Sequence, residues 1–241
     1  MKTLLVIASA LVAFATSAPA ADFYKAPDFN VVPSSVRWNQ LYIGGNIGWT
    51  TGAAATFEET DYSSRQKFGN SWSAGIVAGM TRSIGRTGVV VGIEADFQKL
   101  GIKRVDDYTF LNDYYQETSR TTARAEWLAT ARGLVGYNLG QYLPYVSGGL
   151  AALRFTSANS GTYAYNDGWY KDSGSWSSSS GQYGVGWTVV AGLRYQATRN
   201  VAVDVSHQYV TVDVNDYQSG QYKNNSSFSF SQTKLTALFT F

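Results

Sequence analysis

The sequence predicts an all-β protein whose eight antiparallel strands close into an up-and-down transmembrane β-barrel. The 241 residues are 15% aromatic and include 24 Gly but only 4 Pro, a composition that favours many strands joined by tight turns. Apolar and polar residues alternate with period two in eight segments. Long and short connections between these segments take turns, as expected when strands run up and down around a barrel.

The first 20 residues have the features of a signal peptide. Lys2 supplies a positive charge, 4–15 form an apolar run, and Ala18, Pro19 and Ala20 give the small-x-small pattern that a signal peptidase reads. The apolar run is too short for the roughly 20 residues that a spanning helix needs. We therefore predict export, with cleavage between Ala20 and Ala21, and a short periplasmic lead over 21–37.

The clearest strand is 89–98, where Val91, Ile93 and Phe97 share one face while Glu94 and Asp96 share the other. The same phase recurs along the chain. Strands are predicted at 41–49, 72–81, 89–98, 126–137, 143–155, 186–196, 201–213 and after 226, most clearly over 234–241.

The barrel is predicted to occupy 38–241, with unequal connections at its two ends. Short turns at 83–88, 138–142 and 197–200 contain Gly, Asn and Thr, which suit tight turns. The long connections are predicted as exterior loops at 51–69, 101–121, 156–183 and 214–226.

The scarcity of charged residues indicates which face of the strands meets lipid and which faces the polar interior. A soluble, lipocalin-like barrel would need about 25–35% charged residues on its surface, whereas the whole chain is only 15% charged. The apolar faces are therefore predicted to face lipid, and the few strand charges, which have both signs, to pair inside the barrel because a lone buried charge is costly. This predicted interior network comprises Glu94, Asp96, Glu126, Arg132, Arg194, Asp204 and Lys234.

Aromatic residues near the strand ends fall on the outward phase, as in the girdles at the two surfaces of a membrane. The predicted girdle residues are Trp49, Trp72, Trp127, Tyr137, Trp187, Tyr195 and Tyr209.

The stretches YIGGNIGW at 42–49, VGIEADF at 91–97 and LPYVSGGL at 143–150, with a last strand ending on Phe241, resemble the opacity-type small outer-membrane barrels of Gram-negative bacteria. Within that family the likeness is to porin-like surface antigens and haemin-binding proteins. The resemblance implies an outer-membrane location and makes Phe241, supported by Phe239, the signal read by the barrel-assembly machinery. Leu134 and Leu238 depart from the family, which commonly has polar residues there.

An enzyme is not expected. The single histidine, His207, follows Ser206 directly, so the two side chains point to opposite faces of a strand, and the His-x-Ser arrangement of the lipid A deacylases is missing. The chain has no Cys, and the acidic residues of 101–121 match no calcium loop, so neither metal nor cofactor is predicted.

The remaining functional classes are a structural surface protein, a narrow channel, and loop-mediated binding of haemin or a host factor. An eight-stranded lumen is nearly filled by its own side chains, which favours the structural protein. Aromatic residues among Ser and Gly in 156–183 suit either a recognition loop or a plain solvated loop. A net charge of +2 gives no nucleic-acid footprint. The expected partners are outer-membrane lipid and lipopolysaccharide, whose phosphates could meet Arg120, Arg124 and Arg154.

Overall fold

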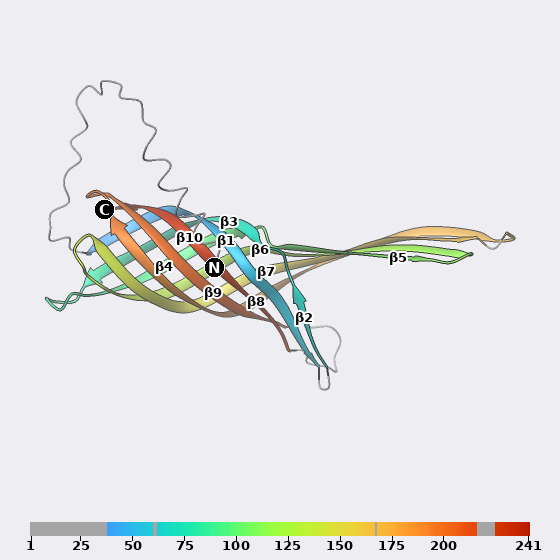
Figure 1. Cartoon of the computed structure of the whole chain (residues 1–241), viewed down its shortest axis with the longest axis horizontal. Helices are drawn as coiled ribbons and strands as arrows, with labels where there is room; N and C mark the ends of the chain where they lie inside the picture. The colour runs from blue at the N-terminus through green and yellow to red at the C-terminus, as the bar shows by residue number, and fades with distance from the viewer. Residues whose placement is uncertain (1–37, 60–61, 167, 216–224) are drawn as a thin grey trace, which may run out of the picture. The chain divides into compact units, whose positions relative to one another are not determined.

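A computed structural model describes residues 38–59, 62–166, 168–215 and 225–241 (Figure 1). The chain divides into two units, Met1–Asn30 and Val31–Phe241, and all described residues belong to the second. The predicted signal peptide 1–20, its cleavage between Ala20 and Ala21, and the lead 21–37 lie outside the described residues. No helix among the described residues is long and apolar enough to cross a membrane.

The described part of the chain folds into antiparallel strands of very different length. They are β1 (Gln40–Glu59), β2 (Tyr62–Lys67), β3 (Ser71–Ser83), β4 (Val89–Leu100), β5 (Lys103–Leu111), β6 (Tyr115–Tyr137), β7 (Tyr142–Asn166), β8 (Lys171–Gln196), β9 (Val201–Asn215) and β10 (Asn225–Thr240).

The sheet closes on itself because the first and last strands pair. The neighbours run β10-β9-β8-β7-β6-β4-β3-β1, and β10 returns to β1 with Ile43 opposite Phe239. The two further strands do not widen the ring: β2 pairs with the outer part of β1, and β5 with the outer part of β6. The predicted eight-stranded up-and-down barrel is therefore the fold.

Short turns join the strands at one end of the barrel, here called the turn end. The turn after β3 uses Gly85 and Gly88 at positive φ, and Ile84 N–H donates to Val89 C=O at 2.8 Å. The next turn places Gly140 at a φ of 74°, a conformation that glycine adopts without steric cost. The opposite end is called the outer end.

The prediction of loops at 51–69, 101–121 and 156–183 was wrong, because strands run through these ranges. β6, β7 and β8 continue past the barrel, and β5 joins them to make a four-stranded sheet that extends from the outer end (Figure 1). Both faces of this outer sheet are largely exposed, so its sequence lacks the apolar alternation that marks a half-buried strand. Of the fourth predicted loop, 214–226, residues 216–224 lie outside the described residues.

The strands turn their apolar side chains outward and their polar side chains inward. Ile93 is 63% exposed on β4, whereas Glu94 and Asp96 beside it are 7% and 4% exposed. The inward residues of β10 run, from the turn end outward, through Leu238, Lys234, Gln232 and Phe230. The lumen is thus layered: an ionic zone and a glutamine zone lie between apolar ends.

Candidate functional site

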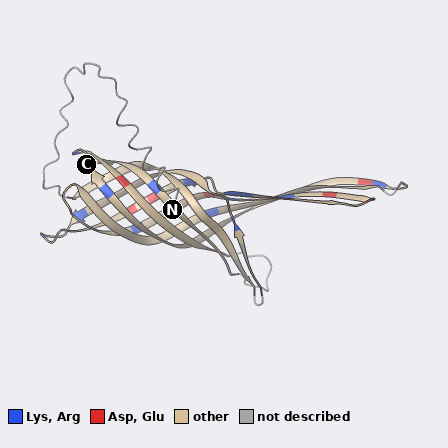
Figure 2. Cartoon of the chain, in the orientation of Figure 1, with Lys and Arg blue, Asp and Glu red and all other residues tan. Residues whose placement is uncertain are grey.

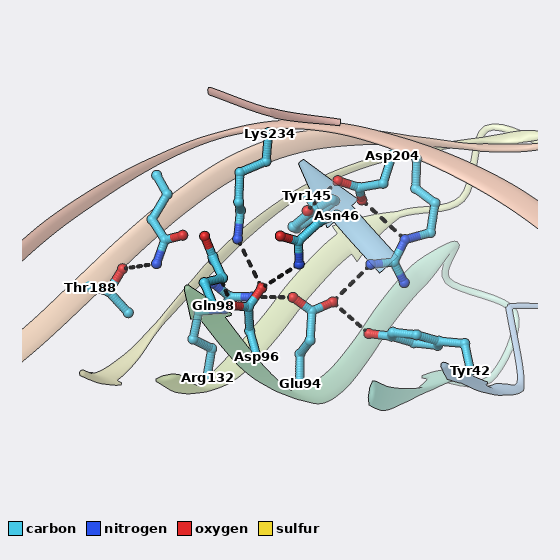
Figure 3. Close-up of polar contacts among 12 residues, drawn as sticks. Tyr42, Asn46, Glu94, Asp96, Gln98, Arg132, Tyr145, Thr188, Asp204 and Lys234 are labelled. Atoms are coloured by element: carbon cyan, nitrogen blue, oxygen red, sulfur yellow. Dashed lines mark hydrogen bonds and ion pairs between the residues drawn. The ribbon is translucent and has the colours of Figure 1, made fainter. Parts of the chain in front are cut away.

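Six charged side chains meet in the middle of the lumen, and we call them the ionic layer. They come from five strands, β4, β6, β8, β9 and β10 (Figure 3). All six are at least nine-tenths buried, and their three carboxylates balance their three cations. The members are Glu94, Asp96, Arg132, Arg194, Asp204 and Lys234.

The ion pairs of this layer form two linked groups. Arg194 joins Glu94 at 2.9 Å to Asp204 at 3.2 Å. Lys234 Nζ lies 3.1 Å from Asp96 Oδ2, and Arg132 connects the groups by pairing with Glu94 while standing 3.9 Å from Asp96. Each charge therefore has an opposite partner, which offsets the several kcal/mol that burial of a lone ion costs.

Four neutral side chains complete the ionic layer, and the sequence analysis did not identify them. Tyr42 Oη donates to Glu94 at 2.8 Å and Tyr145 Oη to Asp204 at 3.1 Å. Asn46 and Gln98 donate amide hydrogens to Asp96 at 3.2 and 2.5 Å. All four lie on the inward phase of their strands, so the alternation that located the charges could also have located them.

Two glycines make room for the tyrosines of this layer. Tyr42 lies opposite Gly79 and Tyr145 opposite Gly192. A Cβ at Gly79 would stand 2.5 Å from Tyr42 Oη, and one at Gly192 would stand 2.7 Å from the Tyr145 ring. The guanidinium of Arg194 lies 4.4 Å from the Tyr42 centroid and 5.4 Å from that of Tyr145, within cation–π range.

Glu126, predicted in the interior network, lies outside it. A bulge between Ala125 and Trp127 shifts the register of β6 against β7, so Ala125 rather than Glu126 takes the buried position. Glu126 instead pairs with Arg154 at 3.2 Å, where both side chains are partly exposed. A bulge of this kind leaves no mark in a simple alternation count.

Apolar side chains close the lumen on both sides of the polar zones. At the turn end, Trp38, Val90 and Leu143 pack together, each fully buried. At the outer end a larger cluster fills the barrel, which we call the outer plug. Its large side chains are Phe68, Leu100, Ile102, Leu128, Leu153, Val210, Val212, Phe228 and Phe230.

The described residues of the ionic layer leave a small cavity between them. A cavity of about 10 Å³ adjoins Glu94, Asp96, Arg194 and Lys234. This is near the minimum volume that a single water molecule needs.

The predicted girdle residues lie on the outside in two groups. Towards the outer end Trp49 packs on Trp72 with ring centroids 4.7 Å apart, and Trp187 packs on Tyr209 at 5.6 Å. Trp127 belongs to this level and contacts Phe97 and Tyr183, which the prediction missed. Towards the turn end lie Tyr137 and Tyr195, the latter 5.1 Å from Tyr142.

The last residues of the chain are also at the turn end. Phe239 is paired with Ile43 and Val201, and Phe241 N–H donates to Leu41 C=O at 2.8 Å. Both phenyl rings are exposed and contact each other at 5.0 Å.

The outer sheet carries a shallow groove of about 650 Å³. Tyr108 and Trp176 line it together with Ser and Thr side chains and the ion pair between Arg120 and Asp107. Of the acidic residues of 101–121, Asp106 and Asp107 are held in ion pairs. No group of three His, Cys, Asp or Glu among the described residues could hold a metal ion. His207 lies outside the barrel, 3.1 Å from Thr233, while Ser206 is buried inside it.

A family model described as outer membrane protein beta-barrel domain matches residues 7–238. The 25 kDa outer-membrane immunogenic protein of Brucella canis is 25% identical over 217 residues, which make up 90% of this chain and 87% of that protein. Its counterpart in Brucella abortus is 24% identical over the same shares. Among solved structures, the outer membrane protein OprG from Pseudomonas aeruginosa aligns with a TM-score of 0.39 and 11% identity, over 86% of this chain and 98% of that one.

Proposed function

This chain belongs to the family of outer membrane protein beta-barrel domains, and from that premise we propose that it is a structural, non-conducting barrel that exposes a β-sheet at the cell surface. It is an outer-membrane protein of the immunogenic surface type found in its relatives. Its finer role, in envelope integrity and surface recognition, is the subject of the proposal.

The observation that carries the proposal is the filled lumen. An ion that crossed the barrel would have to pass an apolar cluster at each end, and would have to separate the paired charges of the ionic layer. A barrel of eight strands has an interior about as wide as its own inward side chains require. The second candidate, a narrow channel, would need a continuous wet path that these layers oppose.

The two aromatic levels support a position across a bilayer. Trp127 and Tyr137 lie on the same face of β6, ten positions apart. At about 3.3 Å per residue and a tilt of about 45°, this separation spans roughly 23 Å of membrane thickness. That matches the apolar band of about 25 Å found on outer-membrane barrels. In this orientation the outer end faces the exterior, and Phe241 at the turn end faces the periplasm.

The outer sheet supports a role in recognition. Its groove combines aromatic rings with small hydroxyl side chains, a mixture that makes adaptable contacts at low entropic cost. Tyr108 is 60% exposed and Trp176 is 38% exposed, so both rings are accessible to a ligand.

The proposal includes no catalytic step. His207 and Ser206 face opposite sides of the barrel wall, and a hydrolase needs nucleophile and base within hydrogen-bond reach of each other. The expected result of a lipid A hydrolysis assay is the same null rate for the native protein and for His207→Ala.

Single-channel recording in planar bilayers tests the proposal. We expect no steady conductance at neutral pH from the folded barrel, with a large porin reconstituted in the same way as the positive control. Replacing Phe228 and Phe230 by Ala should open part of the outer plug without touching the ionic layer. A steady, ion-sized conductance from the native protein would contradict the proposal and favour the channel.

A further inference from the structure

Four cations gather on the outside of the barrel where the long strands leave it, and we call them the basic rim. They come from four adjacent strands, β4 to β7. Figure 2 shows blue bands at this level of the chain. The members are Lys99, Lys103, Arg124 and Arg154.

The strand register sets the basic rim directly against the outer aromatic level. Lys99 lies opposite Trp127, and Trp127 lies opposite Arg154. Further outward on the same face, Lys103 lies opposite Arg124. The two pairs lie three to four residues apart along their strands, about 10–13 Å, and neighbouring strands are about 4.8 Å apart, so the four cations form one patch.

The charge of this patch is not balanced by the protein. Like charges directly opposite each other destabilise a sheet, yet Lys103 and Arg124 occupy such a pair. Among the described residues no carboxylate lies within 4.0 Å of Lys99, Lys103 or Arg124, because the ion pairs found involve other cations. Only Arg154 has an acidic partner, Glu126.

Arg120, which the sequence suggested for phosphate binding, does not belong to the patch. The guanidinium of Arg120 donates two hydrogen bonds to Asp107, at 2.6 and 3.1 Å. Arg120 also lies four residues further out along β6 than Arg124, away from the aromatic level.

Elsewhere among the described residues the exposed cations do not gather at this level. Arg82, Arg86 and Arg199 are near the turn end, Lys171 is in the outermost part of β8, and Lys67 is a single exposed cation at the end of β2. On the same outward level, β9 and β3 present Tyr209 and Trp72 rather than cations. An anion that needs several cations together would therefore bind at β4–β7.

We propose that the basic rim binds the phosphate groups of lipid A, the anionic anchor of lipopolysaccharide. The inference rests on the orientation given under the proposed function, in which the outer end faces the leaflet that holds this lipid. Tryptophan and tyrosine mark the headgroup level, so cations at that level and further outward meet phosphates rather than acyl chains. Arg124 and Arg154 can donate forked hydrogen bonds to phosphate, while the lysines add point charges.

Glu126 moderates this site. Its carboxylate holds Arg154 at 3.2 Å and would repel a phosphate at the same place. Arg154 also lies 5.6 Å from the centre of the Tyr183 ring, which fixes its guanidinium beside the patch. Removing the carboxylate frees Arg154 for the lipid.

Binding of lipid A to the folded full barrel in detergent micelles, followed by native mass spectrometry, tests the inference. The combined variant Lys103→Gln, Arg124→Gln should bind diphosphorylated lipid A at least about tenfold more weakly, since it loses two of the four cations and their charge-assisted hydrogen bonds to phosphate. The matched control Arg82→Gln, Arg199→Gln removes two cations from the turn end and should bind as the native protein does. The variant Glu126→Gln should bind several-fold more tightly.

Three results would overturn the inference. They are equal binding by the rim variant and the control, equal binding of dephosphorylated lipid A, and equal binding of phosphatidylglycerol, which would indicate any anionic lipid. Folding of each variant is checked by its shift in gel migration on heating. The result does not depend on conductance. A conducting barrel that binds lipid A through the basic rim contradicts only the proposed function. A non-conducting barrel whose lipid A binding is unchanged in the rim variant contradicts only this inference.

Discussion

Arg194 links two carboxylates and two aromatic rings inside the lumen. It is 2% exposed, pairs with Glu94 and Asp204, and lies over the rings of Tyr42 and Tyr145. No other cation of the ionic layer contacts both tyrosines in this way, among the contacts described. Replacing Arg194 should therefore show how much the ionic layer contributes to the free energy of unfolding.

The substitution Arg194→Met keeps the apolar volume but leaves Glu94 and Asp204 short of one positive charge. Breaking a buried ion pair from one side costs about 3–5 kcal/mol. We expect the free energy of unfolding in urea, measured in lipid vesicles, to fall by that order. Arg199→Met, at an exposed turn, is the control and should change it by less than about 0.5 kcal/mol. Equal midpoints for the two variants would refute the structural role of the layer.

Gly192 supports the same layer by its lack of a side chain. In Gly192→Ala the new methyl group would meet the Tyr145 ring at 2.7 Å, so overpacking should cost about 1–3 kcal/mol. Gly133→Ala is the matched control, because its Cβ would have no neighbour nearer than 4.0 Å. The readout is the temperature at which the folded band disappears on gels, and no difference between the two variants would contradict the contact.

At the scale of an element, β5 depends on charge as well as on backbone pairing. Arg104 holds Asp106, and Arg120 holds Asp107, in exposed ion pairs. The hydrogen bond from Arg120 lowers the pKa of Asp107 below its ordinary value of 3.8, and that from Arg104 does the same for the pKa of Asp106. A carboxyl whose pKa is lowered by folding stabilises the folded form above its unfolded pKa, and this contribution is lost as the pH falls through the folded pKa.

Hydrogen exchange of the β5 amides tests this pH dependence. Above about pH 5 the native protein should exchange more slowly than Asp107→Asn at the same pH, whereas below about pH 3 the two rates should converge. Asp113→Asn, which alters an acidic residue without an ion pair in the described structure, should match the native protein throughout. A difference between native protein and Asp107→Asn that persists in acid would show that the ion pair is not its cause.

For the whole molecule, closure depends on the pairing of β1 with β10. Ile43 and Phe239 are opposite each other on the outer surface, and the chain has no native cysteine. The pair Ile43→Cys, Phe239→Cys should therefore form an intramolecular disulfide, because facing positions on adjacent strands are about 4.5–5.5 Å apart. Under oxidising conditions this variant should keep a compact gel mobility after heating. The control Ile43→Cys, Leu235→Cys, four residues out of register, should not, and equal cross-linking of both would argue against the register.

The long strands show where prediction from sequence was incomplete. Inside the barrel each strand separates lipid from a polar lumen, so the alternation of Ile93 with Glu94 is strong and located the strand correctly. In the outer sheet both faces meet water, so the residues around Thr118 and Ser160 show no alternation of apolar and polar side chains. These segments were therefore predicted as loops. These segments are strands because each pairs with a neighbouring strand. The register of that pairing depends on both segments and cannot be predicted from one of them alone.

The sequence by itself determined the fold class, the strand count of the ring and the face on which most residues of the barrel strands lie, because a period of two and a shortage of charge are properties of the chain. The tertiary structure decided which residues meet. Only the closed ring brings Tyr42 to Glu94 and Lys234 to Asp96 across the lumen, only the bulge beside Trp127 removes Glu126 from the interior, and only the register aligns Lys103 with Arg124. The physical reason is that alternation specifies a direction for each side chain, whereas contact depends on the neighbouring strand and its offset, which are properties of the assembled sheet.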